Sequence, residues 1–113
     1  MRADEVRNII LVGFMASGKS SVGRALSRRT GWPRIDADDE IVYRAGKPIS
    51  DIFRDSGEDA FRQIEREVTT DICNETGRII AAGGGSFIDE QNRKTMLELG
   101  TVFYLSAPHR RSF

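Results

Sequence analysis

The stretch NIILVGFMASGKS, residues 8–20, decides the fold of this chain. Its first five residues form an apolar run rich in β-branched side chains, and Gly13 ends this run. Such a run is typical of a strand that is buried on both faces of a parallel sheet. Beyond Gly18 the apolar residues recur every three or four positions from Val22 onward, until Gly31 stops the pattern. The stretch therefore predicts a strand, a glycine loop and a helix in succession.

Residues 13–20, GFMASGKS, match the phosphate-loop pattern GxxxxGK[ST] between a predicted strand and a predicted helix, the context that the pattern requires. Glycines let successive backbone N–H groups surround a phosphate, and the helix directs its positive end toward it. Lys19 is expected to reach the β- and γ-phosphates, and Ser20 to bind Mg²⁺, which prefers oxygen ligands. A turn that binds nothing is the alternative, and the flanking elements disfavour it. The expected nucleotide-binding residues are Gly13, Ala16, Ser17, Gly18, Lys19, Ser20 and Ser21.

Strand and helix patterns alternate along the rest of the chain. The predicted strands are 34–35, 78–82 and 101–105. The predicted helices are about 38–46, 50–57, 58–75 and 91–99, the second with Ser50 as its N-cap. Such alternation favours a three-layer α/β fold of the P-loop type, with a parallel sheet and helices on both of its faces. Ligands of such sheets bind at the carboxyl ends of the strands.

Composition narrows the class of protein. The chain of 113 residues is expected to be one domain, and its 17 basic and 17 acidic residues give zero net charge. A neutral chain argues against a nucleic-acid binder, and apolar runs of strand length argue against a membrane protein. Without a signal peptide we expect a cytoplasmic protein, and we expect a monomer. The lone Cys73 predicts neither a disulfide nor a zinc site.

A P-loop leaves kinases, GTPases and ATPases open, so the phosphate acceptor must be argued from other residues. Asp36 and Asp38 stand where the second strand is predicted to end. One carboxylate can serve the metal, and the other can accept a hydroxyl proton as general base. An N-cap cluster of Asp38 with Asp39 and Glu40 is an equally good explanation of these charges.

Two further features indicate an anionic acceptor. The arginine fork of Arg62, on the long predicted helix, suits a planar carboxylate, although a surface ion pair with neighbouring glutamates is the alternative. Gly83 to Gly85 directly follow the third predicted strand, where glycines let the backbone approach a ligand closely. A flexible turn is the alternative reading of this triplet.

From about Asn8 to Ser106 the chain resembles the shikimate kinases. Four segments are similar, in order, to the P-loop, DxD element, substrate-binding stretch and glycine triplet of that family: GFMASGKSSVG, IDADDEI, ISDIFRDSGEDAFRQIE and AAGGGSF. The resemblance implies Mg²⁺- and ATP-dependent phosphorylation of the shikimate 3-hydroxyl, giving shikimate 3-phosphate and ADP in aromatic amino-acid biosynthesis. It also implies a single kinase core over residues 1–113, with a helical substrate-binding segment at about 36–66.

The resemblance also implies roles for individual residues. Lys19 and Asp38 would be catalytic, with Asp38 binding the reactive hydroxyl and acting as its base. Asp36 would help to hold Mg²⁺ with Ser20, through water, and Arg62 would grip the shikimate carboxylate. The implied substrate-binding residues are Asp38, Phe53, Phe61, Arg62, Glu65, Gly83, Gly84 and Gly85.

The sequence departs from the family pattern in two ways. Ala16 stands where family members usually have glycine. Family members also continue into a lid and a final strand and helix, which we expect to be missing from this chain. An inactive nucleotide-binding fragment or pseudo-kinase, or a P-loop kinase for another small hydroxy acid such as gluconate, therefore remains as an alternative.

Overall fold

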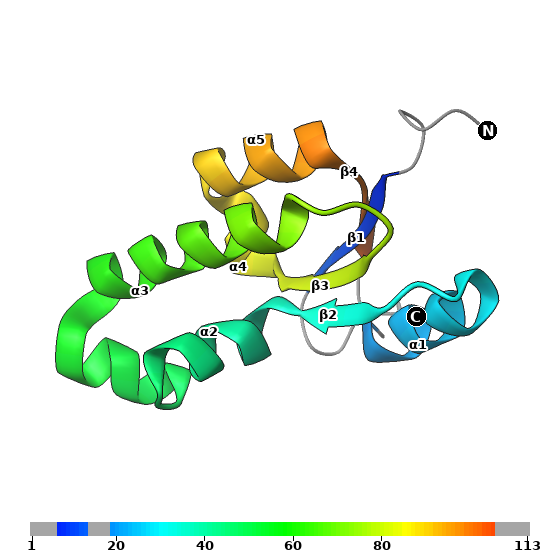
Figure 1. The fold of residues 1–113 in the computed structure, drawn as a ribbon. Coiled ribbons are helices and arrows are strands. Elements are labelled where there is room, and N and C mark those ends of the chain that lie inside the picture. Colours follow the sequence, from blue (N-terminus) through cyan, green and yellow to red (C-terminus); the bar gives the residue numbers. More distant parts are fainter. Residues whose placement is uncertain (1–6, 14–18, 106–113) are drawn as a thin grey trace, which may run out of the picture.

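The computed structural model describes residues 7–13 and 19–105. Within them, four strands form one sheet in the order β2-β3-β1-β4 (Figure 1). The strands are β1 (Asn8–Gly13), β2 (Arg34–Asp36), β3 (Ile79–Gly83) and β4 (Gly100–Leu105). Every neighbouring pair is parallel, which confirms the predicted sheet type. The expectations for Ala16, Ser17 and Gly18 lie outside the described residues.

Helices cover both faces of the sheet, as predicted. They are α1 (Lys19–Thr30), α2 (Ala37–Ala45), α3 (Ile49–Cys73), α4 (Gly84–Ile88) and α5 (Glu90–Leu99). Figure 1 shows α1 on one side of the sheet, with α3 and α5 on the other. This division follows from the strand period of two, because successive side chains of β1 point to opposite faces.

The main core lies between the sheet and the α2–α3–α5 side. Ile10 and Val12 of β1 are fully buried there, in one cluster with Ile41 of α2, Phe61 of α3 and Met96 of α5. Each such side chain contributes about 1.5–3 kcal/mol by leaving water. The apolar residues that recur along each segment therefore pack into one continuous core.

A buried asparagine fastens the amino end of β1. The Asn8 side-chain Nδ2 donates to the carbonyl oxygens of Cys73, at 3.0 Å, and Leu99, at 3.3 Å. Its Oδ1 accepts from the backbone N–H of Arg78 at 3.1 Å. The buried amide therefore has its donors and its acceptor satisfied, as buried polar groups require. It joins β1 to the ends of α3 and α5, at the edge of the sheet opposite the glycine-rich ends.

The bounds of α3 correct two predictions. The helix begins at Ile49 with Pro48 as N-cap and no side-chain capping bond, so the prediction of Ser50 as N-cap was wrong. Pro48 already has the dihedral angle that a helix start needs, and its carbonyl accepts from the N–H of Asp51 at 3.0 Å. The helix also ends at Cys73 instead of Glu75.

The two helices predicted at 50–57 and 58–75 are the two arms of α3. Gly57, at φ 89° and ψ 173°, interrupts the helical dihedral angles between them. Only glycine adopts this backbone conformation readily, because it has no Cβ. The predicted break at Gly57 is therefore confirmed.

The short helix α4 was not predicted. The glycine triplet was predicted as a site of close ligand approach, with a flexible turn as the alternative, and glycine disfavours helices by about 1 kcal/mol relative to alanine. In the structure Gly83 is the N-cap, and the helix runs from Gly84 to Ile88. Among the helices of the described ranges, none combines the length and apolar content needed to cross a bilayer.

Candidate active site

The glycines of two separate segments meet at the carboxyl edge of the sheet. Gly13, which ends β1 and begins the P-loop sequence, pairs in register with Gly83, the last residue of β3. Asp36, the last residue of β2, pairs with Ala81 of β3. Gly13 has φ 151°, in the region that favours glycine. The sheet therefore brings Gly13, Asp36 and Gly83 to the carboxyl ends of its strands, where ligands of parallel sheets bind.

Lys19 reaches across this edge from the first turn of α1. Its Nζ donates to the carbonyl oxygen of Ala82 at 2.9 Å. This bond holds the ammonium group beside the end of β3, where the glycine triplet starts. Ser20 and Ser21 follow Lys19 in the same turn of α1. The lysine expected to bind phosphate thus lies next to the segment expected to bind the acceptor.

Asp36 and Asp38 have different surroundings. Asp36 is the N-cap of α2, and its Oδ1 accepts from the backbone N–H of Asp38 at 2.9 Å and of Asp39 at 3.2 Å. The alternative of a capping cluster formed by Asp38, Asp39 and Glu40 is corrected, because these residues lie in the first turn and Asp36 caps them. Acidic residues there are favoured by the positive end of the helix.

Asp38 lies exposed in the first turn of α2, and its carboxyl group holds a proton more readily than a free aspartate does. Partial burial of the carboxyl group is the main cause that raises its pKa above the usual value. The negative charges of Asp36 and Asp39 raise the pKa further, whereas the ammonium group of Lys19 lowers it. A carboxylate with a raised pKa is a stronger base, which is the property that a hydroxyl proton acceptor needs.

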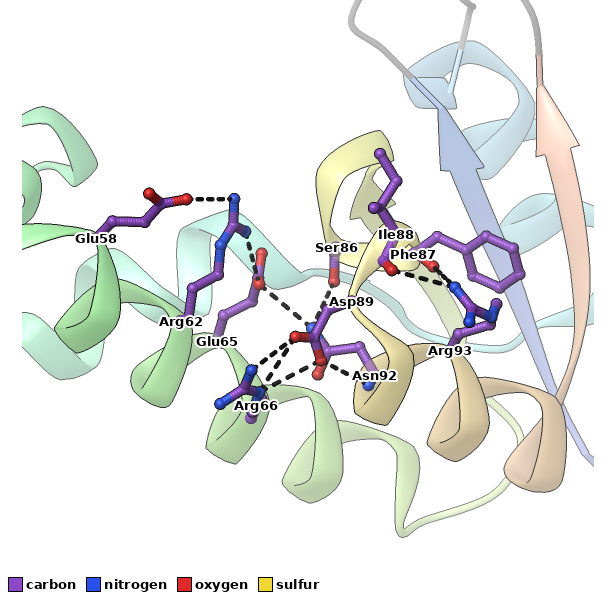
Figure 2. Close-up of polar contacts among 10 residues, drawn as sticks. All are labelled: Glu58, Arg62, Glu65, Arg66, Ser86, Phe87, Ile88, Asp89, Asn92 and Arg93. Carbon is purple, nitrogen blue, oxygen red and sulfur yellow. Dashed lines mark hydrogen bonds and ion pairs between the residues drawn. The ribbon is translucent and has the colours of Figure 1, made fainter.

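Arg62 lies on the second arm of α3, over an aromatic surface. Its Nη1 donates to Glu65 Oε1 at 3.0 Å, and its Nη2 lies 3.6 Å from Glu58 Oε2 (Figure 2). The guanidinium carbon is 5.2 Å from the centre of the Phe61 ring, which stacks on Phe53 at 4.7 Å between ring centres. The predicted ion pairs are therefore present, and 30% of the Arg62 side chain stays exposed. Its planar fork can still receive a carboxylate from solvent.

Glu65 is the buried partner of Arg62, with only 5% of its surface exposed. Burial raises the pKa of its carboxyl group, and the bond from Arg62 acts in the opposite direction. The same oxygen, Oε1, also accepts from Asn92 Nδ2 at 3.2 Å. Glu65 therefore braces the arginine from within the protein.

The glycine triplet leaves open space beside the backbone. A Cβ atom built on Gly83 or on Gly85 meets no heavy atom of residues 7–13 and 19–105 within 4 Å. Neither residue has a positive φ, so the folded chain itself does not demand glycine at either position. The described part of the chain leaves this space, at the same end of the strands as Lys19, open to a ligand.

Sequence reasoning missed four polar residues that flank this site. Ser86, Asp89 and Asn92 lie on or beside α4 and α5, and Arg66 faces them from α3 (Figure 2). Asp89, the N-cap of α5, could have been found, because aspartate commonly stands just before a helical pattern. The pairing of Arg66 with Asp89 and of Asn92 with Glu65 spans more than twenty residues, so local patterns do not indicate it.

A protein-only metal cage is not seen in residues 7–13 and 19–105, where no three histidine, cysteine, aspartate or glutamate side chains gather. Mg²⁺ in phosphoryl-transfer sites is held by one or two protein oxygens together with phosphates and waters, so such a cage is not required. Asp36 uses one carboxylate oxygen, Oδ1, for both capping bonds. Its donor chemistry fits a magnesium ion bound through water.

The parallel sheet, the GxxxxGKS sequence that begins at the end of β1 and the aspartates at and beyond the end of β2 place the chain in the P-loop fold class. A family model described as shikimate kinase matches residues 15–112. The chain belongs to the shikimate kinase family.

Individual relatives agree with this assignment. The chain is 43% identical over 103 residues to a shikimate kinase of Persephonella marina, a match that covers 91% of this chain and 63% of the relative. A solved shikimate kinase from Acinetobacter baumannii, in complex with shikimate, superposes with a TM-score of 0.86 at 36% identity. That match covers 92% of this chain and 58% of the other. The chain thus spans about three fifths of the length of these two proteins.

A gluconokinase from Sinorhizobium meliloti is a more distant neighbour. It superposes with a TM-score of 0.55 at 18% identity, over 87% of this chain and 56% of that one. At this identity the likeness concerns the fold alone. It gives the gluconate alternative no support beyond the shared architecture.

Proposed function

We propose that this chain provides the P-loop and the shikimate-binding elements of a shikimate kinase, which transfers the γ-phosphoryl group of ATP to the 3-hydroxyl of shikimate. The observation that carries the proposal is the gathering of Lys19, Asp38 and the glycine triplet at one sheet edge, with the Arg62 fork on the adjoining helix. Membership of the family supports the choice of shikimate.

The proposed reaction is an in-line displacement. Asp38 accepts the proton of the 3-hydroxyl as its oxygen bonds to the γ-phosphorus of ATP. The bond from that phosphorus to the bridging oxygen breaks, and ADP leaves. Lys19 exchanges its bond to the Ala82 carbonyl for the β- and γ-phosphates and offsets the charge that develops there.

Shikimate recognition is proposed to rest on α2, α3 and the glycine triplet. Arg62 receives the shikimate carboxylate as a bidentate partner. Phe53 and Phe61 form an aromatic wall beside it, and Glu65 braces it from the interior. Gly83 at the end of β3, with Gly84 and Gly85 at the start of α4, lines the pocket. Within the proposed single core, residues 36–66 therefore form the substrate-binding segment.

Magnesium is proposed to bind through the hydroxyl of Ser20 and, by way of water, through Asp36. Both supply the oxygen donors that the ion prefers, and the helix cap holds the Asp36 carboxylate in place. Bound Mg²⁺ neutralises charge on the phosphates of ATP. We further propose that the protein acts as a monomer in the cytoplasm, which sedimentation of the purified chain and fractionation of cells test.

Calorimetric titration with shikimate tests the proposal, because binding can be measured without turnover. We expect saturable heat from the unaltered chain and its loss in Arg62→Ala. Asp38→Asn is expected to weaken binding, since this carboxylate contacts the reacting hydroxyl. The matched control is Arg54→Ala, because Arg54 lies on the same helix with 68% of its side chain exposed and pairs with Asp51 and Asp55.

Two outcomes would replace the proposal. Binding of ADP without any heat from shikimate, in a chain folded by circular dichroism, would favour a nucleotide-binding module. Stronger competition by gluconate or another hydroxy acid would change the acceptor while keeping the kinase. Binding of shikimate that persists in Arg62→Ala would contradict the assignment of the carboxylate site.

A further inference from the structure

We infer that Asn92 is a positioning residue, which holds Glu65, and through it Arg62, in a fixed place relative to the glycine triplet. The inference rests on the proposed function for the identity of the ligand, whereas the contacts of Asn92 are independent of that function. Asn92 lies on α5, and no element of the sequence motifs includes it.

The Asn92 side chain is buried where α3, α4 and α5 meet, with 1% of its surface exposed. Its Nδ2 donates to Glu65 Oε1 at 3.2 Å and lies 3.4 Å from Ser86 Oγ (Figure 2). Glu65 is on α3, and Ser86 is on α4, directly after the glycine triplet. One amide group therefore connects the helix that carries Arg62 with the segment that carries the glycines.

A single oxygen atom links Asn92 to the arginine. Glu65 Oε1 accepts from Asn92 Nδ2 and also from Arg62 Nη1, the latter at 3.0 Å. Because Asn92 binds its carboxylate, Glu65 cannot move together with Arg62 without breaking this buried hydrogen bond. The guanidinium group is thus held in its binding position before the ligand binds, and less conformational entropy is lost on binding.

An ion pair between helices holds Asn92 in turn. Arg66 of α3 donates from Nη2 to Asp89 Oδ1 at 2.8 Å, and its Nε lies 3.3 Å from each oxygen of the same carboxylate. Asp89 also accepts the backbone N–H of Asn92 at 3.0 Å, as the N-cap of α5. The arginine draws the start of α5 against α3, and Asn92 is in the first turn of that helix. Its side chain is therefore placed from two directions.

The amide suits this position because it donates a hydrogen bond without adding charge. A second cation beside Glu65 would compete with Arg62 for the carboxylate. A carboxylate would repel Glu65 and would oppose the approach of an anionic ligand. A neutral donor braces Glu65 and leaves the positive charge of Arg62 available.

The test compares two buried asparagines. Asn92→Ala removes the brace, and Asn8→Ala removes an equally buried amide at the opposite edge of the sheet, where it bonds Cys73 and Leu99. Both variants should lower the melting temperature. Only Asn92→Ala should weaken shikimate binding, by about tenfold, the effect of losing one hydrogen bond to a charged group. Equal shikimate affinities in the two folded variants would overturn the inference.

A second measurement needs no ligand. In ¹⁵N-labelled protein, the Nε–Hε group of Arg62 should lose order in Asn92→Ala but keep it in Asn8→Ala, and Arg54 should be unaffected in both. Unchanged order of Arg62 in Asn92→Ala would overturn the inference even if shikimate binds. Absence of shikimate binding in the unaltered chain would instead count against the proposed function, and the order of Arg62 would still decide the role of Asn92. Should Asn92→Ala not fold, Asn92→Leu keeps a similar volume, removes the donor without adding charge, and serves in both measurements.

Discussion

Gly13 and Gly83 are register partners on neighbouring parallel strands, so the P-loop and the glycine triplet leave the sheet side by side. The two segments are seventy residues apart in the sequence and become adjacent only when β3 inserts between β1 and β2. A phosphate bound at the first segment would therefore lie beside a ligand bound at the second. Substitutions at this end of the strands should therefore affect ligand binding, whereas substitutions at the amino ends should affect stability alone.

Gly85→Ala should separate ligand binding from stability. Among the residues that the structure describes, none lies within 4 Å of an added Cβ, and Gly85 is in α4 without a positive φ. Alanine should therefore stabilise the fold by about 0.4–1 kcal/mol or leave it unchanged. The methyl group would occupy the space proposed for shikimate, so its affinity should fall. Urea unfolding and calorimetry on the same preparation measure both effects, and a variant with unchanged affinity would remove Gly85 from the site.

Gly100→Ala should have the opposite pattern. Its Cβ would lie 2.6 Å from Ile10 Cδ1 and 3.0 Å from the carbonyl oxygen of Asn8. The backbone is extended at φ −162°, so the conflict is one of packing alone. We expect a loss of about 1–3 kcal/mol in the free energy of unfolding, measured in urea. Gly100 lies at the amino end of β4, whereas the candidate site lies at the carboxyl ends of the strands. Shikimate affinity in the folded fraction should therefore be unaltered.

Asp38→Asn should stabilise the protein at pH 7. Burial and neighbouring carboxylates raise the pKa of Asp38 in the folded state, so its ionised form opposes folding at neutral pH. Asparagine removes this cost and should raise the melting temperature. As the pH falls through the raised pKa and below the unfolded value of about 3.9, the native carboxyl group gains its proton and the difference between variants should vanish.

Thermal unfolding of Asp38→Asn at pH 7 and at pH 3.5 checks this prediction. Glu98→Gln, at an exposed position on α5, is the control for removal of a negative charge. A destabilised Asp38→Asn at pH 7 would mean that the carboxylate makes a favourable contact in the fold. It would then be a structural residue more than a base held ready for a substrate.

Lys19→Ala should weaken nucleotide binding and spare the fold. The described bond of this side chain goes to the Ala82 carbonyl at the partly buried edge of the sheet, so its loss costs about 1 kcal/mol. Affinity for ADP should fall much more, because the ammonium group carries charge to the phosphates. Fluorescence titration with a labelled ADP measures the affinity. An unchanged value would remove the premise that residues 13–20 form a phosphate-binding loop.

Most strands of the sheet could be predicted from the sequence, and so could the end of the sheet at which the candidate site lies. Runs such as Ile9 to Val12 and the glycines that end them are local signals, and a parallel sheet then places all carboxyl ends together. For the same reason the aspartates after β2 were expected near the P-loop. In the structure Asp36 pairs with Ala81 of β3, and Gly83 of the same strand pairs with Gly13.

Contacts between distant segments could not be read in the same way. Asn92 reaches Glu65 across 27 residues, and no periodicity indicates which buried amide meets which carboxylate. The capping alternative named Asp38 with Asp39 and Glu40, whereas the N-cap of α2 is Asp36, whose backbone is extended at φ −103° and ψ 120°. Helix α4 forms against the local preference of its two glycines, because its place is fixed by the end of β3 and by Asn92.

The interruption at Gly57 has a geometric result for the aromatic pair. Eight residues of an unbroken α-helix cover about 12 Å along its axis, so two rings with that spacing would stand apart. Phe53 and Phe61 nevertheless stack with their centres 4.7 Å from each other, one on each arm of α3. The non-helical backbone angles of Gly57 thus bend α3 so that its two aromatic side chains meet. The surface under Arg62 owes its shape to that one hinge, and any residue with a Cβ at position 57 would tend to open it.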